Sequence, residues 1–397
     1  MTLIFVGVVS FLLEEVPLSI AITGFGANVN LLSLFLLIPL IGTFMSTSGY
    51  LSILKEKVQA REEKGQQHPY RLSYFLIATI GTILNYGTLA IVKKIAEESF
   101  SSYQDKKITL NIMRAFGFCM LWSPYFVNVG LILVLFDLSW INFGLYGLFL
   151  AIIYLLISWL MFNKISYADD PIVGATRETT PKKDTSLVPF FTFIFVLICL
   201  SFILDYLLPV NMLTVVSLIA IVFPFIWAIF SNVIKFYIHD VVEQVLHSFF
   251  KVKNELAVFI SAGFFGVALA QTEIGAYVSG LLFQASLGSV YLLSIFIVFL
   301  AIILAQIGIH PLIIIIGIGS SLSPLKFGVS PEYMALILLI AWTTATQISP
   351  FSGQVLMASH LMHQSPTVVI KENYQFALTT ALVLTTVVYG LFMIGLL

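Results

Sequence analysis

Long hydrophobic stretches follow one another along almost the whole chain and leave only short polar segments between them. A helix that crosses a membrane needs about 20 consecutive apolar residues. Two stretches, about 71–93 and 291–322, have a polar or helix-breaking centre, so each is either a crossing helix or a re-entrant hairpin. The other stretches predict crossing helices at 2–21, 30–52, 109–137, 140–163, 189–208, 212–232, 255–282, 333–361 and 373–396.

The composition supports the class that this pattern indicates. Hydrophobic residues make up 59% of the 397 residues, charged residues only 10%, and the mean hydropathy is +1.02. Soluble domains contain about 25% charged residues. We therefore predict an all-α polytopic membrane protein. The net charge of -1 indicates no particular partner, and the sequence offers no basic surface for nucleic acid. Neither a cofactor nor a metal centre is expected, apart from a transported Na+.

The positions of the basic residues discriminate between crossing helices and hairpins, because cytoplasmic loops are enriched in Lys and Arg. If both ambiguous stretches are re-entrant and the N-terminus is cytoplasmic, only Lys326 and Arg114 fall outside the cytoplasmic segments. A full crossing at 71–93 would place Lys93 and Lys94 outside. The re-entrant arrangement is therefore favoured, in a multi-pass protein of the cytoplasmic membrane whose C-terminus lies outside.

This arrangement predicts an internal inverted repeat. Residues 1–163 form the first copy, with a hairpin at about 71–93 and a broken helix at about 109–137. A cytoplasmic linker at 164–188 follows. Residues 189–397 form the second copy with one extra helix, a hairpin at about 291–322 and a broken helix at about 333–361.

The two broken helices contain similar interruptions. Ser123-Pro124 lies in the first, and Ser349-Pro350-Phe351-Ser352-Gly353 lies 226 residues later in the second; a carboxamide follows each at the same distance, Asn128 and Gln354. Proline removes a backbone donor, and unsatisfied backbone is tolerated at membrane depth only against protein or a water-filled cavity. Matching breaks in two halves indicate the binding site of a transporter, where freed carbonyls bind a cation and helix N-termini bind an anion.

The hairpin tips complete the candidate site. Asn85-Tyr86-Gly87-Thr88 and Gly308-Ile309-His310-Pro311 are expected to meet the breaks near the midplane. His310 either donates to a substrate or takes up a proton, or it is a neutral ring bonded to the backbone. The candidate binding residues are Asn85, Gly87, Thr88, Ser123, Pro124, Asn128, Gly308, His310, Pro311, Thr346, Ser349, Pro350, Ser352, Gly353 and Gln354.

Charged residues within predicted spans are further candidates, because such residues are costly in a membrane. Glu14 and Glu15 either relay protons or lie at the interface. Arg114 either extends to the lipid headgroups or attracts an anion.

At the level of layout, the chain resembles the ion transporter superfamily, which includes divalent-anion/sodium symporters and related organic-anion carriers. The resemblance rests on Asn85 to Thr88 and Gly308 to Pro311 as hairpin tips, and on the two Ser-Pro breaks as unwound helices. It implies a site between the tips and the breaks. It also implies elevator-like movement of a hairpin-bearing domain, often within a homodimer.

The sequence therefore predicts a secondary active transporter rather than an enzyme. Its expected partners are the lipid bilayer and a small organic anion, moved with Na+ or H+ by alternating access. The alternative within transport is a cation/proton antiporter that uses Glu14, Glu15 or His310. A membrane-embedded enzyme acting on a lipid-linked substrate is the less favoured alternative, because the loops lack a metal or nucleophile pattern.

Overall fold

The computed structural model describes residues 2–14, 16–62, 68–85, 87–174 and 186–397. Glu15, Tyr86 and residues 175–185 of the predicted linker lie outside the described residues. The helices and strands, in chain order, are α1 (Thr2–Leu13), α2 (Leu18–Gly24), α3 (Val29–Leu37), α4 (Pro39–Thr47), α5 (Tyr50–Glu62), α6 (Pro69–Leu76), the π-helix η1 (Ile77–Gly81), α7 (Thr82–Leu84), α8 (Gly87–Ser99), β1 (Tyr103–Gln104), α9 (Asp105–Met120), α10 (Val127–Leu135), α11 (Trp140–Leu160), the 3-10 helix η2 (Phe162–Lys164), β2 (Ile172–Val173), α12 (Val188–Leu207), α13 (Met212–Phe230), α14 (Ile234–Ala270), α15 (Glu273–Ala285), α16 (Val290–Gln306), α17 (Pro311–Ser321), the 3-10 helix η3 (Pro324–Phe327), α18 (Pro331–Ile348), α19 (Gly353–Met362) and α20 (Pro366–Met393).

The protein is an all-α, multi-pass integral membrane protein, as the hydrophobic pattern predicts. The described residues contain six segments that are long and apolar enough to cross a membrane: Leu18–Thr47, Trp140–Leu160, Val188–Leu207, Met212–Phe230, Pro331–Met362 and Pro366–Met393. A seventh is added if the bent pair Ser279–Ala285 and Val290–Gln306, which meet at 115°, is taken as one span. The six segments correspond to six of the predicted crossings.

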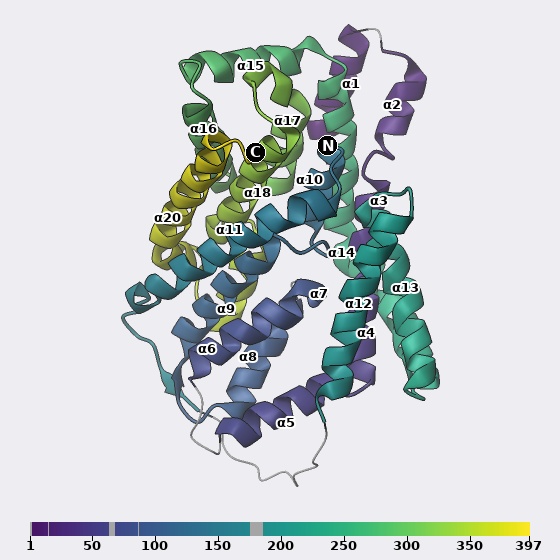
Figure 1. Cartoon of the computed structure of the whole chain (residues 1–397), viewed down its shortest axis with the longest axis vertical. Coiled ribbons are helices and arrows are strands. Elements are labelled where there is room, and N and C mark those ends of the chain that lie inside the picture. Colours follow the sequence, from purple (N-terminus) through teal and green to yellow (C-terminus); the bar gives the residue numbers. More distant parts are fainter. Residues whose placement is uncertain (1, 15, 63–67, 86, 175–185) are drawn as a thin grey trace.

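Two of the predicted spans are wrong as continuous helices. The segment 2–21 is divided, because α1 ends at Leu13 and α2 begins at Leu18, directly after Pro17. The segment 255–282 is also divided: α14 ends at Ala270, and α15 crosses the upper end of the molecule in Figure 1. Hydropathy averaged over about 20 residues conceals such short polar interruptions.

The helix α1 is too short to cross a membrane by itself. The 12 residues of α1 extend about 18 Å at 1.5 Å per residue, which is shorter than the roughly 30 Å hydrocarbon core. Figure 1 places both α1 and the end of α20 in the upper half of the molecule, away from α5 at the lower end. A cytoplasmic N-terminus and a C-terminus outside stay a prediction.

The four arms around the predicted hairpin tips lie in opposite halves of the molecule. Figure 1 shows α6 and α8 in the lower half and α16 and α17 in the upper half. The helix α18 runs between them, and its residues from Tyr333 to Ile348 are all buried. It packs against α16, α17, α19 and α20 and against α9 and α10 of the first broken helix. The interruption in α18 and α19 therefore lies inside protein, where unsatisfied backbone is tolerated.

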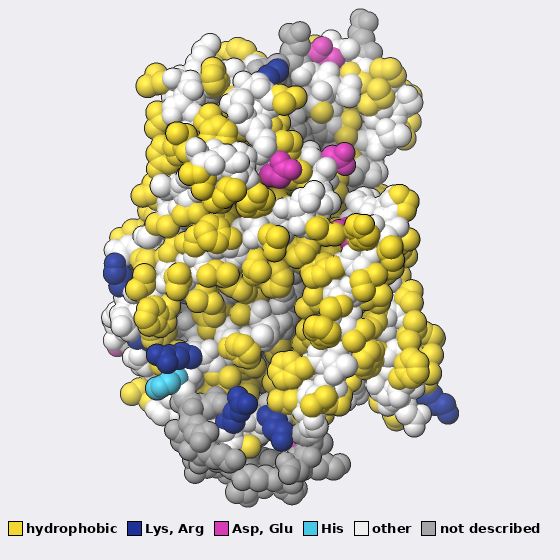
Figure 2. Space-filling view, viewed as in Figure 1, with side chains coloured by type: hydrophobic (Ala, Val, Ile, Leu, Met, Phe, Trp, Pro, Cys, Tyr) yellow, Lys and Arg dark blue, Asp and Glu magenta, His cyan; other side chains and the backbone are white. Residues whose placement is uncertain are grey.

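The surface is mostly apolar, as expected for a protein surrounded by lipid. Figure 2 shows hydrophobic side chains over most of the visible face and several Lys and Arg side chains gathered towards its lower end. Exposed examples on helices of crossing length are Leu145 (71%), Phe195 (69%) and Phe230 (82%). Apolar area of this extent is unfavourable in water but not against acyl chains.

Candidate functional site

A cavity of about 280 Å³ lies where both predicted hairpin tips and both breaks meet. It is lined by seven of the residues that the sequence singles out: Asn85, Asn128, His310, Pro311, Thr346, Ser352 and Gly353. Residues separated by more than 260 positions thus contribute to one cavity. Aromatic side chains form much of the remaining wall, namely Phe35, Phe126, Phe259, Trp342 and Phe351.

Three helix N-termini contribute to the lining of this cavity. The helix α10 begins at Val127, α17 at Pro311 and α19 at Gly353, and all three residues line the cavity. The first backbone N–H groups of a helix have no partner within the helix, and its N-terminus carries about half a positive charge. Among the described lining residues there is no Asp, Glu, Lys or Arg. The cavity therefore combines positive partial charge with walls that have no formal charge when His310 is neutral.

The first break is tied to the first hairpin by Ser123. This side chain is fully buried; its hydroxyl donates to the Thr82 carbonyl at 2.7 Å and accepts the Tyr125 N–H at 3.3 Å. Thr82 belongs to the arm that leads into Asn85. Ser123 thus satisfies one carbonyl of the hairpin and one N–H of the unwound segment.

The second break repeats this geometry. The Ser349 hydroxyl donates to the Ala305 carbonyl at 3.0 Å, near the end of α16, and accepts the Phe351 N–H at 3.3 Å. Ser123, Ser349 and the prolines that follow them, Pro124 and Pro350, do not line the cavity. Their direct role in binding stays a prediction, whereas their structural role is visible.

The two carboxamides differ in their partners. Asn128 donates to the Met120 carbonyl at 2.7 Å and so satisfies an orphan group at the end of α9. Gln354 is fully buried and donates only to the Met120 sulfur at 3.2 Å, and its Oε1 atom has no hydrogen-bond partner among the described residues. Such an atom costs about 1–3 kcal/mol when left unpaired.

Ser352 caps the helix α19 at the cavity. Its hydroxyl accepts the Val355 N–H at 3.2 Å and donates to the Thr346 carbonyl at 2.6 Å. The corresponding N-cap of α10 is Phe126, which has no side-chain hydrogen bond to offer. A hydroxyl therefore lines the cavity only at the second break.

The first tip is formed around Asn85, which has a positive φ of 54°. Its ψ of -144° places it outside the left-handed helical region, in a conformation that residues other than glycine rarely adopt. Its carbonyl accepts the Thr88 N–H at 3.1 Å. The Thr88 hydroxyl is buried without a partner among the described residues, and neither Thr88 nor Gly87 lines the cavity.

The second tip presents His310 to the cavity. Its Nδ1 atom accepts the Leu312 N–H at 3.2 Å, which caps α17. An accepting Nδ1 assigns the proton of a neutral ring to Nε2, the remaining donor. Gly308 has φ of 104°, and a Cβ atom there would lie 3.3 Å from the Phe351 ring. The turn therefore favours glycine for two reasons: the positive φ, and the close approach of the Phe351 ring.

A larger cleft of about 710 Å³ adjoins the cavity on the side of α4 and the first hairpin. Cavity and cleft share the lining residues Phe35 and Asn85. Asp240 and Glu243 of α14 line the cleft, and the Thr47 hydroxyl donates to the Asp240 carboxylate. The cleft therefore brings acidic groups and Asn85 to one solute-accessible space.

The charged candidates within predicted spans lie outside the cavity. Glu14 is exposed in the turn between α1 and α2. Arg114 is only 2% exposed, so it does not extend to the headgroups. Its guanidinium donates to Asn373 Oδ1 at 2.9 Å and to the Met161 carbonyl at 3.3 Å. Among the described residues no carboxylate forms an ion pair with it, and the Phe376 ring lies 4.4 Å away.

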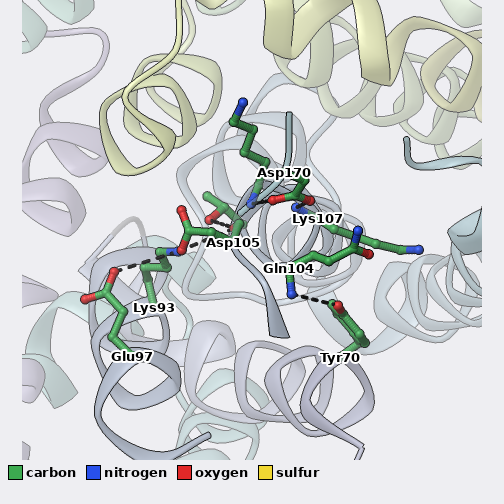
Figure 3. A network of polar contacts seen from close by, with 9 residues as sticks. Tyr70, Lys93, Glu97, Gln104, Asp105, Lys107 and Asp170 are labelled. Carbon is green, nitrogen blue, oxygen red and sulfur yellow. Dashed lines mark hydrogen bonds and ion pairs between the residues drawn. The ribbon is translucent and has the colours of Figure 1, made fainter. Parts of the chain in front are cut away.

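The base of the first broken helix is held by a network that the sequence analysis did not identify (Figure 3). The Asp170 carboxylate accepts the N–H groups of Lys106 at 2.7 Å and Lys107 at 3.0 Å, at the N-terminus of α9. The ammonium of Lys93, from α8, pairs with Asp105. The sequence offers only a weak signal for this network, namely Asp170 directly before Pro171. In the structure the residues that follow form β2, which pairs with β1.

The fold is similar to that of a solved structure, the Alcanivorax borkumensis YdaH transporter, whose crystal structure is described as revealing an unusual topology. The similarity covers 94% of this chain and 88% of that chain, with a TM-score of 0.59 and 13% sequence identity. At this identity the likeness concerns the fold. No family model matches the chain, and no curated protein matches its sequence. Membership of the ion transporter superfamily stays a prediction.

Proposed function

We propose that the chain is a secondary active transporter that moves a small organic anion, coupled to Na+ or H+, by alternating access. The observation that carries the proposal is the cavity at which both tips and both breaks converge. The fold likeness to a transporter supports the general class. The proposal includes the inverted repeat, with one re-entrant hairpin in each half.

The charge distribution favours an anion as the substrate. The N-termini of α10 and α19 lie at the cavity, and the first backbone N–H groups of a helix bind carboxylates and other oxyanions. At α17 only the positive end of the helix dipole contributes, because Pro311 has no N–H and the Leu312 N–H is bonded to His310 Nδ1. The described lining residues include no carboxylate that would repel an anion. His310 adds a donor at Nε2 on the same wall.

The walls favour an organic over an inorganic anion. Phe35, Phe259 and Trp342 face the space that the polar groups leave. Small-molecule sites typically combine apolar walls with a few polar groups that fix orientation. An organic acid would place its carboxylate at the helix N-termini and its carbon skeleton against these rings.

The test is thermal stabilisation of the purified protein by a panel of small carboxylates and inorganic oxyanions, with Na+ replaced by choline and pH varied. A ligand that binds only the folded state raises the melting temperature. We expect an organic anion to stabilise the protein in a manner that depends on Na+ or pH. Ser352→Ala should weaken this shift, whereas Ser33→Ala, whose hydroxyl bonds only within α3, should not.

A cation/proton antiporter is the second candidate, because Asp240 and Glu243 line the cleft that adjoins the cavity. Acidic residues in a cleft raise the local concentration of cations. This candidate predicts stabilisation by a lone cation or by pH, without any anion, and loss of that effect in Asp240→Asn. Stabilisation by an anion that survives Asp240→Asn would exclude it.

A further inference from the structure

A third concave surface shares no lining residue with the central cavity or with the cleft beside it. It is a groove of about 610 Å³ between α6 with η1 on one side and the end of α11 on the other. Its lining includes Phe75, Ala78 and Trp159. None of its lining residues lines the central cavity.

The apolar part of the groove faces the surroundings of the protein. Phe75 is 56% exposed and Trp159 is 61% exposed, and α11 is a helix of membrane-crossing length. The apolar surface of a helix of crossing length faces acyl chains rather than water over most of its span. An occupant of this part must therefore be apolar.

One end of the groove is basic. His68 and Arg71 line it at the start of α6, and Arg71 is exposed and makes no hydrogen bond or ion pair with the described residues. The Lys107 ammonium lies 4.7 Å from the centroid of Phe162, another lining residue. The nearby Asp170 carboxylate is engaged by two backbone N–H groups, so a cationic side chain remains available on the rim.

We propose that this groove binds an anionic phospholipid of the surrounding bilayer, with the phosphate on Arg71 and an acyl chain along Phe75 and Trp159. The arrangement of a basic rim above apolar walls matches the two ends of such a molecule. Trp and Tyr side chains are typical of the interface where headgroup and chain meet, and Tyr70 and Trp159 both line the groove. Basic pockets between helices on the cytoplasmic side are a known form of lipid recognition.

The position of the groove links the lipid to the first hairpin. Ala78 lies in η1, the π-helical stretch that leads through α7 to Asn85. Ser158 of α11 and Asn111 of α9 line the same groove. A bound lipid therefore contacts the arm of the first hairpin and the helices against which that arm packs.

The experiment is native mass spectrometry of the full-length protein in detergent, with phosphatidylglycerol and phosphatidylcholine added separately and then in competition. Arg71→Gln removes the rim charge. Ala78→Phe fills the apolar part. Arg61→Gln is the matched control, because Arg61 is an exposed arginine on α5 that does not line the groove.

We expect wild type and Arg61→Gln to retain phosphatidylglycerol several-fold more than phosphatidylcholine. Arg71→Gln should bind both lipids equally, and Ala78→Phe should retain less of both. Equal retention of the two lipids by wild type would overturn the proposal. So would a preference that Arg71→Gln keeps or that Arg61→Gln loses. The same spectra count protein chains, and an Ala78→Phe variant with altered chain number but unchanged lipid would assign the groove to a second copy instead.

Discussion

The two breaks share one construction but differ in what they leave at the cavity. In each, a serine donates to the preceding hairpin arm and accepts an N–H of the unwound segment: Ser123 with Thr82, and Ser349 with Ala305. Three residues later the breaks differ. The N-cap of the helix after the first break is Phe126, an aromatic residue, whereas the N-cap after the second break is Ser352, whose hydroxyl caps the helix.

This difference separates a structural role from a binding role within one motif. The serines at the first position are needed wherever an unwound segment meets a hairpin, since the carbonyl and the N–H would otherwise be unpaired. Only the later position reaches the cavity, through Ser352 on one side and the Phe126 ring on the other. We infer that the second break supplies most of the polar groups at the cavity, whereas the first break supplies an apolar wall that shapes it.

The largest effect is expected where backbone packs against the first break. A Cβ atom at Gly147 would lie 2.4 Å from the Leu121 carbonyl oxygen, whereas a Cβ atom at Gly390 would meet nothing within 4 Å. Because a backbone oxygen cannot rotate away, Gly147→Ala should destabilise the protein near the upper end of about 1–3 kcal/mol. Gly390→Ala should be neutral or stabilise by up to about 1 kcal/mol. Thermal unfolding in detergent measures both; equal shifts would contradict the proposed packing.

The next effect tests the equivalence of the two serines. Ser123→Ala and Ser349→Ala each leave a buried carbonyl and an N–H without their partner. We expect each to lower stability by a similar amount, about 2 kcal/mol, with Ser33→Ala as the control of small effect. If one substitution were neutral in the melting experiment, the breaks would not share a construction.

A smaller effect is expected at the position where the breaks differ. Ser352→Ala removes the cap of α19 and should cost about 1 kcal/mol, together with a loss of ligand-induced stabilisation. Ser352→Asn supplies another capping oxygen, so it should recover the melting temperature of the unliganded protein. If Ser352→Asn also recovered ligand binding to the wild-type level, ligand binding would depend on the helix cap rather than on the serine hydroxyl.

The smallest effect is expected at Gln354. Gln354→Met removes the cost of the unpaired Oε1 atom and also the hydrogen bond from Nε2 to the Met120 sulfur. Because these effects oppose each other, the stability of the unliganded protein should change by less than about 1 kcal/mol. Gln375→Met, at an exposed position, is the control. A loss of several degrees in melting temperature for Gln354→Met alone would indicate a partner that the unliganded fold supplies to this amide.

Much of this site follows from local sequence, because proline and serine act on the backbone around them. The breaks at Ser123-Pro124 and Ser349-Pro350 and the turns at Asn85 and Gly308 have strong local signals, and the structure shows an interruption at each. The walls of the cavity could not be predicted in the same way. Phe35 and Phe259 come from α3 and α14, and nothing in their neighbourhoods distinguishes them from other lipid-facing or packing aromatics.

The failures have a common physical cause. Hydropathy describes the medium around a helix but not where the helix ends. The predicted spans 2–21 and 255–282 are therefore interrupted in the structure, at Pro17 and at the polar residues 271–273. The location of Arg114 also depended on distant residues. The buried guanidinium is accommodated by the Met161 carbonyl and by the approach of Asn373 and Phe376 from α20.

The hydrogen bond between Arg114 and Asn373 implies an order of events during synthesis. Arg114 and Asn373 are separated by 259 positions, which at roughly 5–20 residues per second leaves an interval on the order of 10–50 s between their emergence from the ribosome. Throughout this interval α9 carries a cation whose eventual acceptors in α20 do not yet exist. The nascent first half must therefore keep this guanidinium in contact with water or headgroups, and its burial becomes possible only when the last helix arrives.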